Sequence, residues 1–392
     1  MEAWGSVAWS GITTSVGPGD LAYDAPVDNG AIVPFRAVGF DGGTPAVSAR
    51  TYVPSVGWAN LPSTLPEHHV LRLLEPAFRD DAPARAAETA RAWFADGVLT
   101  TDAEPAFYAY RLTLEGSASV GVVALVDLDA GHLRPHEDVI ASYAIRQARL
   151  AEATRAQWEP ITAYTTGDPV APLIMDELDR PADRVAVDGD RTDEIWAITS
   201  ASSVARIRAH LDGQPLVIAD GHHRYAAWRT SYEREGRLAL TLVFDPPALA
   251  VGPIHRVVGS LDLDEAVKGL PLPAVDLSGV DAAARFVSEG ESRCVLTDGV
   301  RFLGVDPYEC APCWVEDVFT PHHGLESDAV SYEPDLRAAA RTVAEGGGVA
   351  LLLSTPTIAT ITRAATTGRL LPHKSSWFRP KPRVGMVMRS WA

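Results

Sequence analysis

Residues 215–233 read PLVIADGHHRYAAWRTSYE and combine two structural patterns. A continuous apolar run leads to Asp220 and Gly221, which is typical of a buried strand. The pattern after the glycine is helical and extends to about Gly236. The stretch therefore predicts a strand, a tight turn and a helix, an arrangement of mixed α/β or α+β folds. The predicted helix carries an aromatic stripe expected to face the core, at Tyr225, Trp228 and Tyr232.

The turn is chemically unusual because five polar or flexible residues, from Asp220 to Arg224, are consecutive. Gly221 tolerates unusual dihedrals and lets a ligand approach the backbone. The first N–H groups of a helix are unpaired and carry partial positive charge, so they attract anions. We predict that Gly221, His222, His223 and Arg224 bind a phosphate, with Arg224 donating two parallel hydrogen bonds. We expect Asp220 to orient a histidine, hold a metal ion or accept a proton.

Two other interpretations of the turn remain open. Asp220 alone is a good helix cap, and the histidines would then only be solvated. A zinc site is less favoured, because neighbouring residues of a helix point about 100° apart.

Length and charge limit the possible functions. The chain has 392 residues, which predicts two or three domains or subdomains. Its net charge of −17 argues against a nucleic-acid partner, since polyanions bind basic faces. No apolar run approaches the ~20 residues that span a membrane. The N-terminus shows no secretory signal pattern, and we expect a cytoplasmic protein.

The chain has three cysteines, Cys294, Cys310 and Cys313. That number fits a reducing compartment and argues against a disulfide framework. The last two form a C-x-x-C pair, but a zinc site would need two more ligands. We expect an incidental pair of thiols.

The stretch GHHRYAAW resembles the sulfiredoxin signature, in which Gly-Cys-His-Arg-Tyr-Ala-Ala opens a helix and holds the phosphates of ATP. His222 stands where sulfiredoxin has its essential cysteine, so sulfiredoxin's reaction is not implied. The same fold includes ParB-type CTP-binding proteins and free-serine kinases, and the serine kinases are more similar at the DGHHR positions.

More of the chain resembles the uncharacterised DUF1015 family. The stretches that carry this resemblance span residues 34–387 and include RPHEDV, EIWAIT, LVIADGHHRYAAW, IHRVVGSL, VSYEPD and LPHKSSWFRPKPRVGMV. The family usually opens with a Pro-Tyr-Asp element. The nearest candidate here, RTYVPS around Tyr52, lacks the acid, which puts any role of that acid in doubt.

The pattern along the chain changes near residue 260 and again near 80–105, and together with these resemblances this predicts a three-part organisation. We expect an N-terminal α/β region at 1–104 and a ParB/sulfiredoxin-like core at 105–260. A C-terminal α/β subdomain with the basic segment KSSWFRPKPR would occupy 261–392.

The segment RPHEDV precedes a long predicted helix at about 136–157. Acids at a helix start favour its dipole and need no further role. A serine-kinase-like enzyme, however, needs a carboxylate to accept the hydroxyl proton of its acceptor. The resemblance implies that Glu137 is this base, with Asp220 and His223 as further catalytic candidates. His136 and Arg149 are predicted to contact the substrate, and Gln157 is a secondary candidate.

The basic segment near the C-terminus is either a phosphate clamp or a solvated strand edge. We favour Lys374 as a further phosphate ligand. His255 and Arg256 lie inside an apolar strand, where a core histidine satisfied by the backbone is the expected role.

Together these features predict a nucleotide-dependent phosphotransferase that acts on a hydroxyl of an amino acid or similar metabolite. The nucleotide would be ATP, ADP or CTP with Mg²⁺, and a homodimer is possible. The main alternative is a ParB-type nucleotide switch without fast chemistry. A fold that has lost its nucleotide and a metal-dependent hydrolase are also open.

Overall fold

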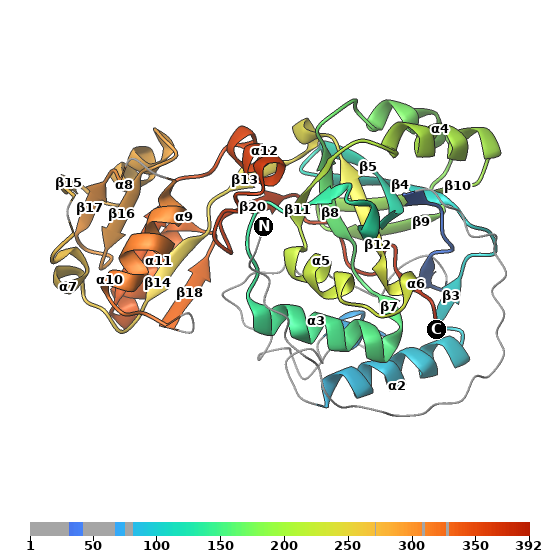
Figure 1. Ribbon diagram of the computed structural model, residues 1–392, viewed down its shortest axis with the longest axis horizontal. Helices are drawn as coiled ribbons and strands as arrows, with labels where there is room; N and C mark the ends of the chain where they lie inside the picture. Colours follow the sequence, from blue (N-terminus) through green and yellow to red (C-terminus); the bar gives the residue numbers. More distant parts are fainter. Residues whose placement is uncertain (1–30, 42–66, 75–80, 271, 308–309, 327–328) are drawn as a thin grey trace.

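The computed structural model describes residues 31–41, 67–74, 81–270, 272–307, 310–326 and 329–392. Within them the chain forms two large β-sheets that lie side by side, each covered by helices, and three two-stranded sheets (Figure 1). The fold is mixed α/β, as predicted from the strand–turn–helix pattern.

The larger sheet has the strand order β6-β11-β8-β12-β5-β4-β10-β9, with β1 added beside β5. Its pairings are mixed, since β12 runs parallel to β8 and antiparallel to β5. Its strands are β1 (Ile32–Val33), β4 (Phe107–Leu114), β5 (Ser117–Asp127), β6 (Leu133–Arg134), β8 (Ile161–Thr165), β9 (Arg184–Asp188), β10 (Arg191–Ile198), β11 (Leu216–Asp220) and β12 (Leu238–Phe244).

Apolar side chains cover both faces of the larger sheet, which explains its near-continuous apolar strands. One face packs against α3 (Ala141–Thr154), α4 (Ala201–Leu211) and α5 (His222–Arg229). The other face packs against α12 (Ile358–Thr367) and the C-terminal segment that follows it. A smaller cluster joins the remaining N-terminal pieces to α3: β2 (Val38–Phe40), α1 (Leu71–Leu74), α2 (Ala82–Ala95) and β3 (Leu99–Thr101).

The smaller sheet has the order β15-β17-β16-β19-β14-β18. Its strands are β14 (His255–Val258), β15 (Val275–Leu277), β16 (Cys294–Thr297), β17 (Phe302–Val305), β18 (Val330–Glu333) and β19 (Val349–Leu353). Helices cover both faces: α7 (Leu263–Val267) and α9 (Ala311–Trp314) on one, α8 (Val280–Ser288) and α11 (Leu336–Gly346) on the other, while α10 (Thr320–His322) contributes no buried residue.

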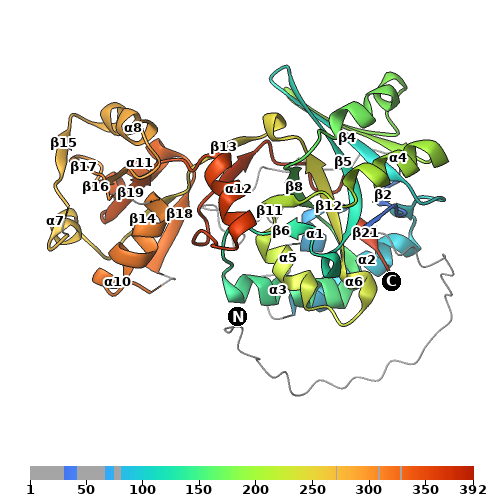
Figure 2. The same cartoon turned by 45° about the horizontal axis from the view of Figure 1, so that its top comes forward.

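After the smaller sheet the chain returns to the larger body (Figure 2). There β20 (Trp377–Arg379) pairs with β13 (Ala250–Gly252), and β21 (Arg389–Ser390) pairs with β7 (Ala156–Gln157). The basic segment predicted for the C-terminal subdomain therefore lies against the larger sheet. The division at residues 104 and 260 stays a prediction.

A buried ionic cluster fixes the returning segment in place. The backbone N–H of Arg383 donates to the Tyr110 hydroxyl at 2.9 Å, and its Nε donates to Asp193 at 2.9 Å. Arg191 donates to the same carboxylate and to the carbonyl of Lys381. Because both partners of the Arg383–Asp193 pair are almost fully buried, removing either would leave an uncompensated charge.

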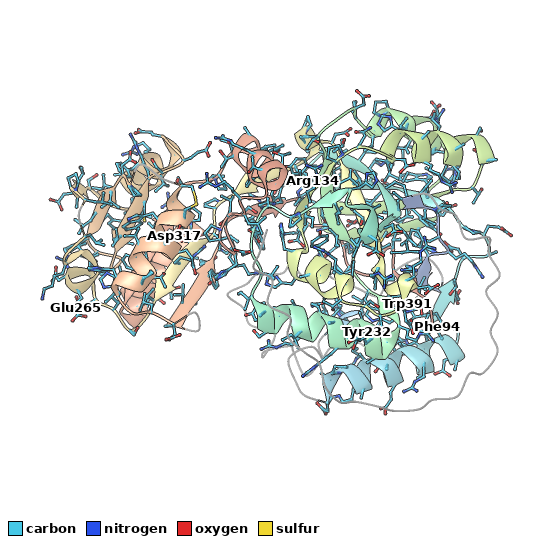
Figure 3. All side chains as sticks on the ribbon, in the orientation of Figure 1. Phe94, Arg134, Tyr232, Glu265, Asp317 and Trp391 are labelled. Atoms are coloured by element: carbon cyan, nitrogen blue, oxygen red, sulfur yellow. A yellow bond between two sulfur atoms is a disulfide. The ribbon has the colours of Figure 1, made fainter. Side chains whose placement is uncertain are left out.

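Two helix boundaries differ from the sequence-based expectation. Helix α5 ends at Arg229, and a separate short helix, α6, covers Arg234–Arg237. Tyr232 therefore lies between helices and is 85% exposed, so its predicted core position was wrong (Figure 3). The long helix begins at residue 141, because the preceding segment is extended and Glu137 pairs with Leu371.

The expectation of incidental thiols was also wrong, since Cys310 and Cys313 are joined by a disulfide. Cys294 is a free, buried thiol. In the part of the chain that the structure describes, no helix has the length and apolar character needed to cross a membrane.

The packing of the larger sheet predicts a steric effect at Gly121 of β5. A Cβ there would lie 2.5 Å from the carbonyl oxygen of Val243 and 2.8 Å from the ring of Phe244. We expect Gly121→Ala to lower the free energy of unfolding by about 1–3 kcal/mol, measured by urea denaturation. Gly259→Ala is the control, because a Cβ there meets nothing within 4 Å. Equal midpoints for the two variants would contradict this packing.

Candidate functional site

The turn after β11 forms as the sequence predicted. The pairing of β11 with β8 is irregular between Ile218 and Asp220, so the strand ends in a local kink. Gly221 follows with φ +100°, a left-handed conformation that favours glycine. Helix α5 then begins at His222 with no side chain capping its first turn. A Cβ on Gly221 would strain the backbone at this φ and would lie 2.9 Å from the Arg224 guanidinium, which would have to shift.

Arg224 is held by a set of acceptors behind the turn. Its guanidinium donates to Glu159 at 2.6 Å, to the carbonyl of Pro160 at 3.0 Å and to Asp220 at 2.8 Å. Lys381 forms a second ion pair with Asp220. These contacts direct the terminal nitrogens of Arg224 to Glu159 and Asp220. The Nε of Arg224 is buried and has no hydrogen-bond partner among the described residues.

The two acids beside Arg224 have shifted pKa values. Burial alone would raise the pKa of Asp220, but Lys381 and Arg224 outweigh it and hold that pKa well below its usual range. Burial raises the pKa of Glu159, and the Arg224 charge opposes only part of that effect. Asp220 is therefore an ionised group that organises two cations at the turn.

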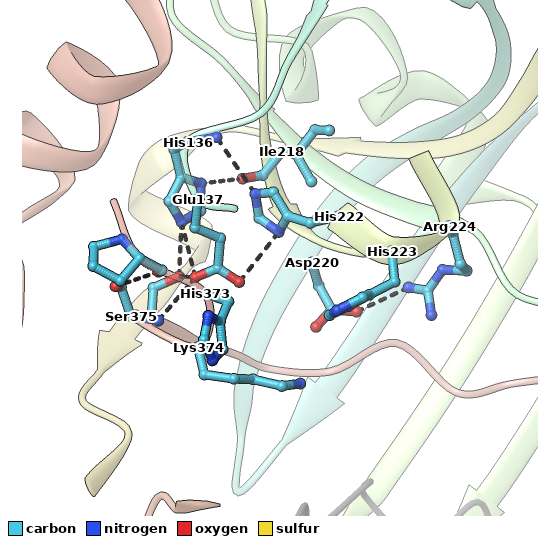
Figure 4. Close-up of polar contacts among 12 residues, drawn as sticks. His136, Glu137, Ile218, Asp220, His222, His223, Arg224, His373, Lys374 and Ser375 are labelled. Carbon is cyan, nitrogen blue, oxygen red and sulfur yellow. Dashed lines mark hydrogen bonds and ion pairs between the residues drawn. The ribbon is translucent and has the colours of Figure 1, made fainter. Parts of the chain in front are cut away.

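The extended segment before α3 brings His136 and Glu137 to the turn (Figure 4). The His136 ring is fully buried, and its Nδ1 lies 2.7 Å from the carbonyl oxygen of Ile218 on β11. Because a carbonyl only accepts, Nδ1 carries the proton, and Nε2 accepts the hydroxyl of Ser376 at 2.8 Å. Burial lowers the His136 pKa to about 4, so the ring is neutral.

Glu137 lies at the centre of the cluster and is 7% exposed. Its Oε2 accepts the backbone N–H of Ser375 at 3.0 Å, and its Oε1 lies 3.5 Å from Nδ1 of His222. Burial raises the pKa of Glu137 to about 7, although the Lys374 charge and the Ser375 N–H lower it. A carboxylate with this pKa exchanges a proton near neutral pH, as a general base requires.

The two histidines of the turn have different surroundings. Nε2 of His222 accepts the backbone N–H of His136 at 3.5 Å, which leaves its Nδ1–H facing Glu137. Nε2 of His223 accepts the N–H of Ile140 at 3.0 Å. Burial lowers the pKa of both rings, to about 3 for His223, so both are neutral.

The returning C-terminal segment supplies the remaining side of the site. Lys374 is partly buried with φ +58°, and desolvation lowers its pKa although Glu137 and Asp220 favour its charge. The adjacent Ser375 and Ser376 bind Glu137 and His136 as described above. Side chains from positions 136, 222 and 374 are thus brought together from three distant parts of the chain.

The structure places the other predicted residues elsewhere. Arg149 is exposed on α3. Gln157 is buried and bonds the backbone of Gly236 and Leu240, which gives it a structural role. Tyr52 lies outside the described residues. Substrate contacts by His136 and Arg149 stay predictions.

Sequence reasoning missed four contributors to the site: Glu159, Ser375, Ser376 and Arg256. Glu159 stands alone after a tryptophan, and no local pattern marks it as a partner of Arg224. Ser375 donates its backbone N–H, Ser376 donates its hydroxyl, and Arg256 donates to the backbone carbonyls of His373 and Lys374. Sequence patterns do not reveal such contacts. The sequence placed Lys381 in a basic segment but did not predict its ion pair with Asp220.

A cavity lies apart from this cluster. It measures about 520 Å³ and is lined by residues that include Asp102, Arg180, Arg184 and Ser200. Its two arginines are paired with carboxylates, Arg180 with Asp183 and Arg184 with Asp102. Among the described residues, no group of three or more His, Cys, Asp or Glu side chains could hold a metal ion.

Comparison with known families gives one decisive match. The model of the family described as "Protein of unknown function (DUF1015)" matches residues 32–270. The chain belongs to the DUF1015 family. This match confirms the resemblance drawn from the sequence stretches, and it includes both the RPHEDV segment and the DGHHR turn. No protein with a curated description matches the chain.

Several solved structures are distantly similar in fold. A free serine kinase variant in complex with ADP is 15% identical, with a TM-score of 0.41, covering 68% of this chain and 92% of that one. A conserved hypothetical protein from Pyrococcus furiosus is 13% identical, with a TM-score of 0.40, covering 67% and 92%. SbnI from Staphylococcus aureus, truncated at its C-terminus, is 12% identical, with a TM-score of 0.40, covering 67% and 85%.

The raised pKa of Glu137 has a consequence for stability. The folded pKa, about 7, lies above the usual 4.5, so the folded state binds the proton more tightly than the unfolded chain. The resulting stability is complete below pH 4.5 and is lost as the pH rises through 7. Glu137→Gln removes the buried charge. We therefore expect the free energy of unfolding of the variant, relative to that of the natural chain, to increase between pH 5 and pH 8 by about 3 kcal/mol at most.

Denaturant unfolding at several pH values measures this difference. The control is Glu152→Gln, an exposed carboxylate on α3, whose effect should not change with pH. A constant difference between Glu137→Gln and the natural chain from pH 5 to pH 8 would show that Glu137 is not perturbed by burial.

Proposed function

We propose that this chain is a nucleotide-dependent phosphotransferase that acts on a hydroxyl group of an amino acid or similar small metabolite. The single observation that carries the proposal is the position of Glu137. A buried carboxylate with a pKa of about 7 lies within the same contact network as the Gly221 turn and Lys374. Phosphoryl transfer to a hydroxyl needs both a base for the acceptor and positive groups for the phosphates.

Glu137 would remove the proton from the acceptor hydroxyl. Its Oε2 is held by the Ser375 N–H, and its Oε1 faces the Nδ1–H of His222, so the carboxylate is oriented before the acceptor binds. Lys374 favours the ionised form and so opposes the effect of burial. At neutral pH both forms of the carboxyl group are populated, which suits proton transfer in either direction.

The phosphates of the nucleotide would bind at the start of α5. The bare Gly221 backbone, the uncapped first turn and the nearby Lys374 fit a phosphate in both shape and charge. Arg224 would reach a phosphate only by leaving Glu159 or Asp220, so we expect it chiefly to shape the turn. His223 lines the same turn and is neutral, so it would contribute a hydrogen bond and no charge.

Magnesium ions usually bind to nucleotide phosphates together with one or two carboxylates. Asp220 is the carboxylate at the turn that fits this role, although Lys381 and Arg224 are its partners in this structure. Bound Mg²⁺ would neutralise phosphate charge, and Lys381 would remain close enough to share that task.

Turnover of ATP with Mg²⁺ and a panel of hydroxyl amino acids tests the proposal. We expect phosphorylated product, and we expect Glu137→Gln to lower kcat by about 100- to 10,000-fold while leaving ADP affinity within a few fold. Because the base must be ionised, the rate should rise about tenfold per pH unit below 7 and level off above it. Glu152→Gln is the matched control and should behave like the natural chain.

Two results would argue against the proposal in different ways. Nucleotide binding by calorimetry without product, accompanied by nucleotide-dependent dimerisation, would favour the ParB-type switch. If the chain neither binds nor turns over ATP, CTP or ADP, a nucleotide-dependent function is excluded.

A further inference from the structure

Arg256 is a buried cation that the proposed chemistry does not use. It lies on β14 of the smaller sheet and is 2% exposed. Burying a guanidinium is unfavourable unless its donors find acceptors, so its position requires an explanation. Three backbone carbonyls accept hydrogen bonds from it, and two of them belong to the segment that reaches Glu137.

The contacts of Arg256 converge on the backbone at His373 and Lys374. Nη1 donates to the carbonyl of Lys374 at 2.9 Å and to that of Ile254 at 2.7 Å. Nη2 donates to the carbonyl of His373 at 3.2 Å. The rigid fork of one guanidinium thus fixes two consecutive peptide units, which a lysine ammonium could not do in the same geometry.

Tyr332 holds the same residues from the neighbouring strand. It stands directly opposite Arg256 in the pairing of β14 with β18, and the guanidinium lies 4.9 Å from its ring centre. The Tyr332 hydroxyl lies 2.7 Å from Nε2 of His373. Two residues on one face of the smaller sheet therefore bind His373: Tyr332 contacts its side chain, and Arg256 donates to its carbonyl.

The backbone at Lys374 is strained, and the residues that follow it contact Glu137 and His136. Lys374 has φ +58°, a left-handed conformation that is unfavourable for a non-glycine residue and persists only where surrounding contacts hold it. The next residue, Ser375, donates its N–H to Glu137, and Ser376 donates its hydroxyl to His136. The contacts run without interruption from the smaller sheet to the catalytic carboxylate.

We propose that Arg256 is a positioning residue, through which the smaller sheet sets the backbone at Lys374 and thereby aligns Lys374 and the Ser375 N–H on Glu137. This role deepens the proposed function and rests on it. It also gives the smaller sheet a part in the reaction, because Arg256 of that sheet donates to the carbonyls of His373 and Lys374.

Charged and titratable groups on several elements act on Glu137. They are Lys374 and Arg256, which lower its pKa, Asp220, which raises it, and the rings of His136 and His222 in contact with it. Losing Arg256 removes one of the two stabilising charges and releases the other from its fixed position. Both effects favour the protonated carboxyl group.

The test compares Arg256→Met and Arg256→Lys with Arg389→Met. Arg389 is the matched control, because it is also buried and donates to two backbone carbonyls, those of Glu235 and Leu238. For Arg256→Met we expect the lower pH midpoint of kcat to rise by about one unit. Arg256→Lys keeps the charge without the fork and should shift the midpoint less while still lowering kcat. Arg389→Met should lose stability with no change in midpoint.

A second readout needs no turnover. Hydrogen exchange followed by mass spectrometry on residues 371–379 should be about tenfold faster or more in Arg256→Met than in Arg389→Met, because the Ser375 N–H loses its fixed acceptor geometry. Equal exchange in the two variants, or an unchanged pH midpoint with active enzyme, overturns the positioning role. If the natural chain shows no turnover, the proposed function fails while the exchange result still decides the positioning role.

Discussion

The hydrogen bond from the Ser375 N–H to Glu137 is the contact on which the rest of the site depends. It joins two segments more than two hundred residues apart, and each is fixed by separate contacts. Glu137 is positioned by pairing with Leu371 and by the His136 ring bound to β11. Ser375 is positioned by Arg256 on one side and by the buried Arg383–Asp193 pair further along. Among the described contacts of the Glu137 carboxylate, only the Ser375 N–H lies within 3.0 Å.

Burial of Glu137 links stability to chemistry. A buried ionised carboxylate is destabilising, and the folded chain compensates only in part through the Ser375 N–H, the His222 ring and the charges of Lys374 and Arg256. The protein thus retains a buried acid, Glu137, whose replacement by a neutral residue would increase the stability of the fold. Such conflicts between stability and local chemistry are typical of functional sites and rare elsewhere in a well-packed fold.

Sequence reasoning recovered the features that are local in the chain. The apolar run into Asp220, the glycine and the helix after it were all predicted, because strand, turn and helix signals are short-range. The backbone-satisfied His255 was also predicted, and its Nδ1 accepts the N–H of Leu353. Features set by distant contacts were not predictable: the extended conformation at Glu137 depends on Leu371, and the orientation of Arg224 depends on Glu159.

The central claim is that nucleotide phosphates bind at the start of α5, beside Glu137. A crystal structure of the full chain with ADP and Mg²⁺ tests this directly. We expect phosphate oxygens within hydrogen-bond distance of the backbone N–H groups at residues 222–224, with Lys374 bound to the same phosphates. Phosphates bound instead in the cavity beside Arg180 and Arg184, with the Gly221 turn vacant, would contradict it.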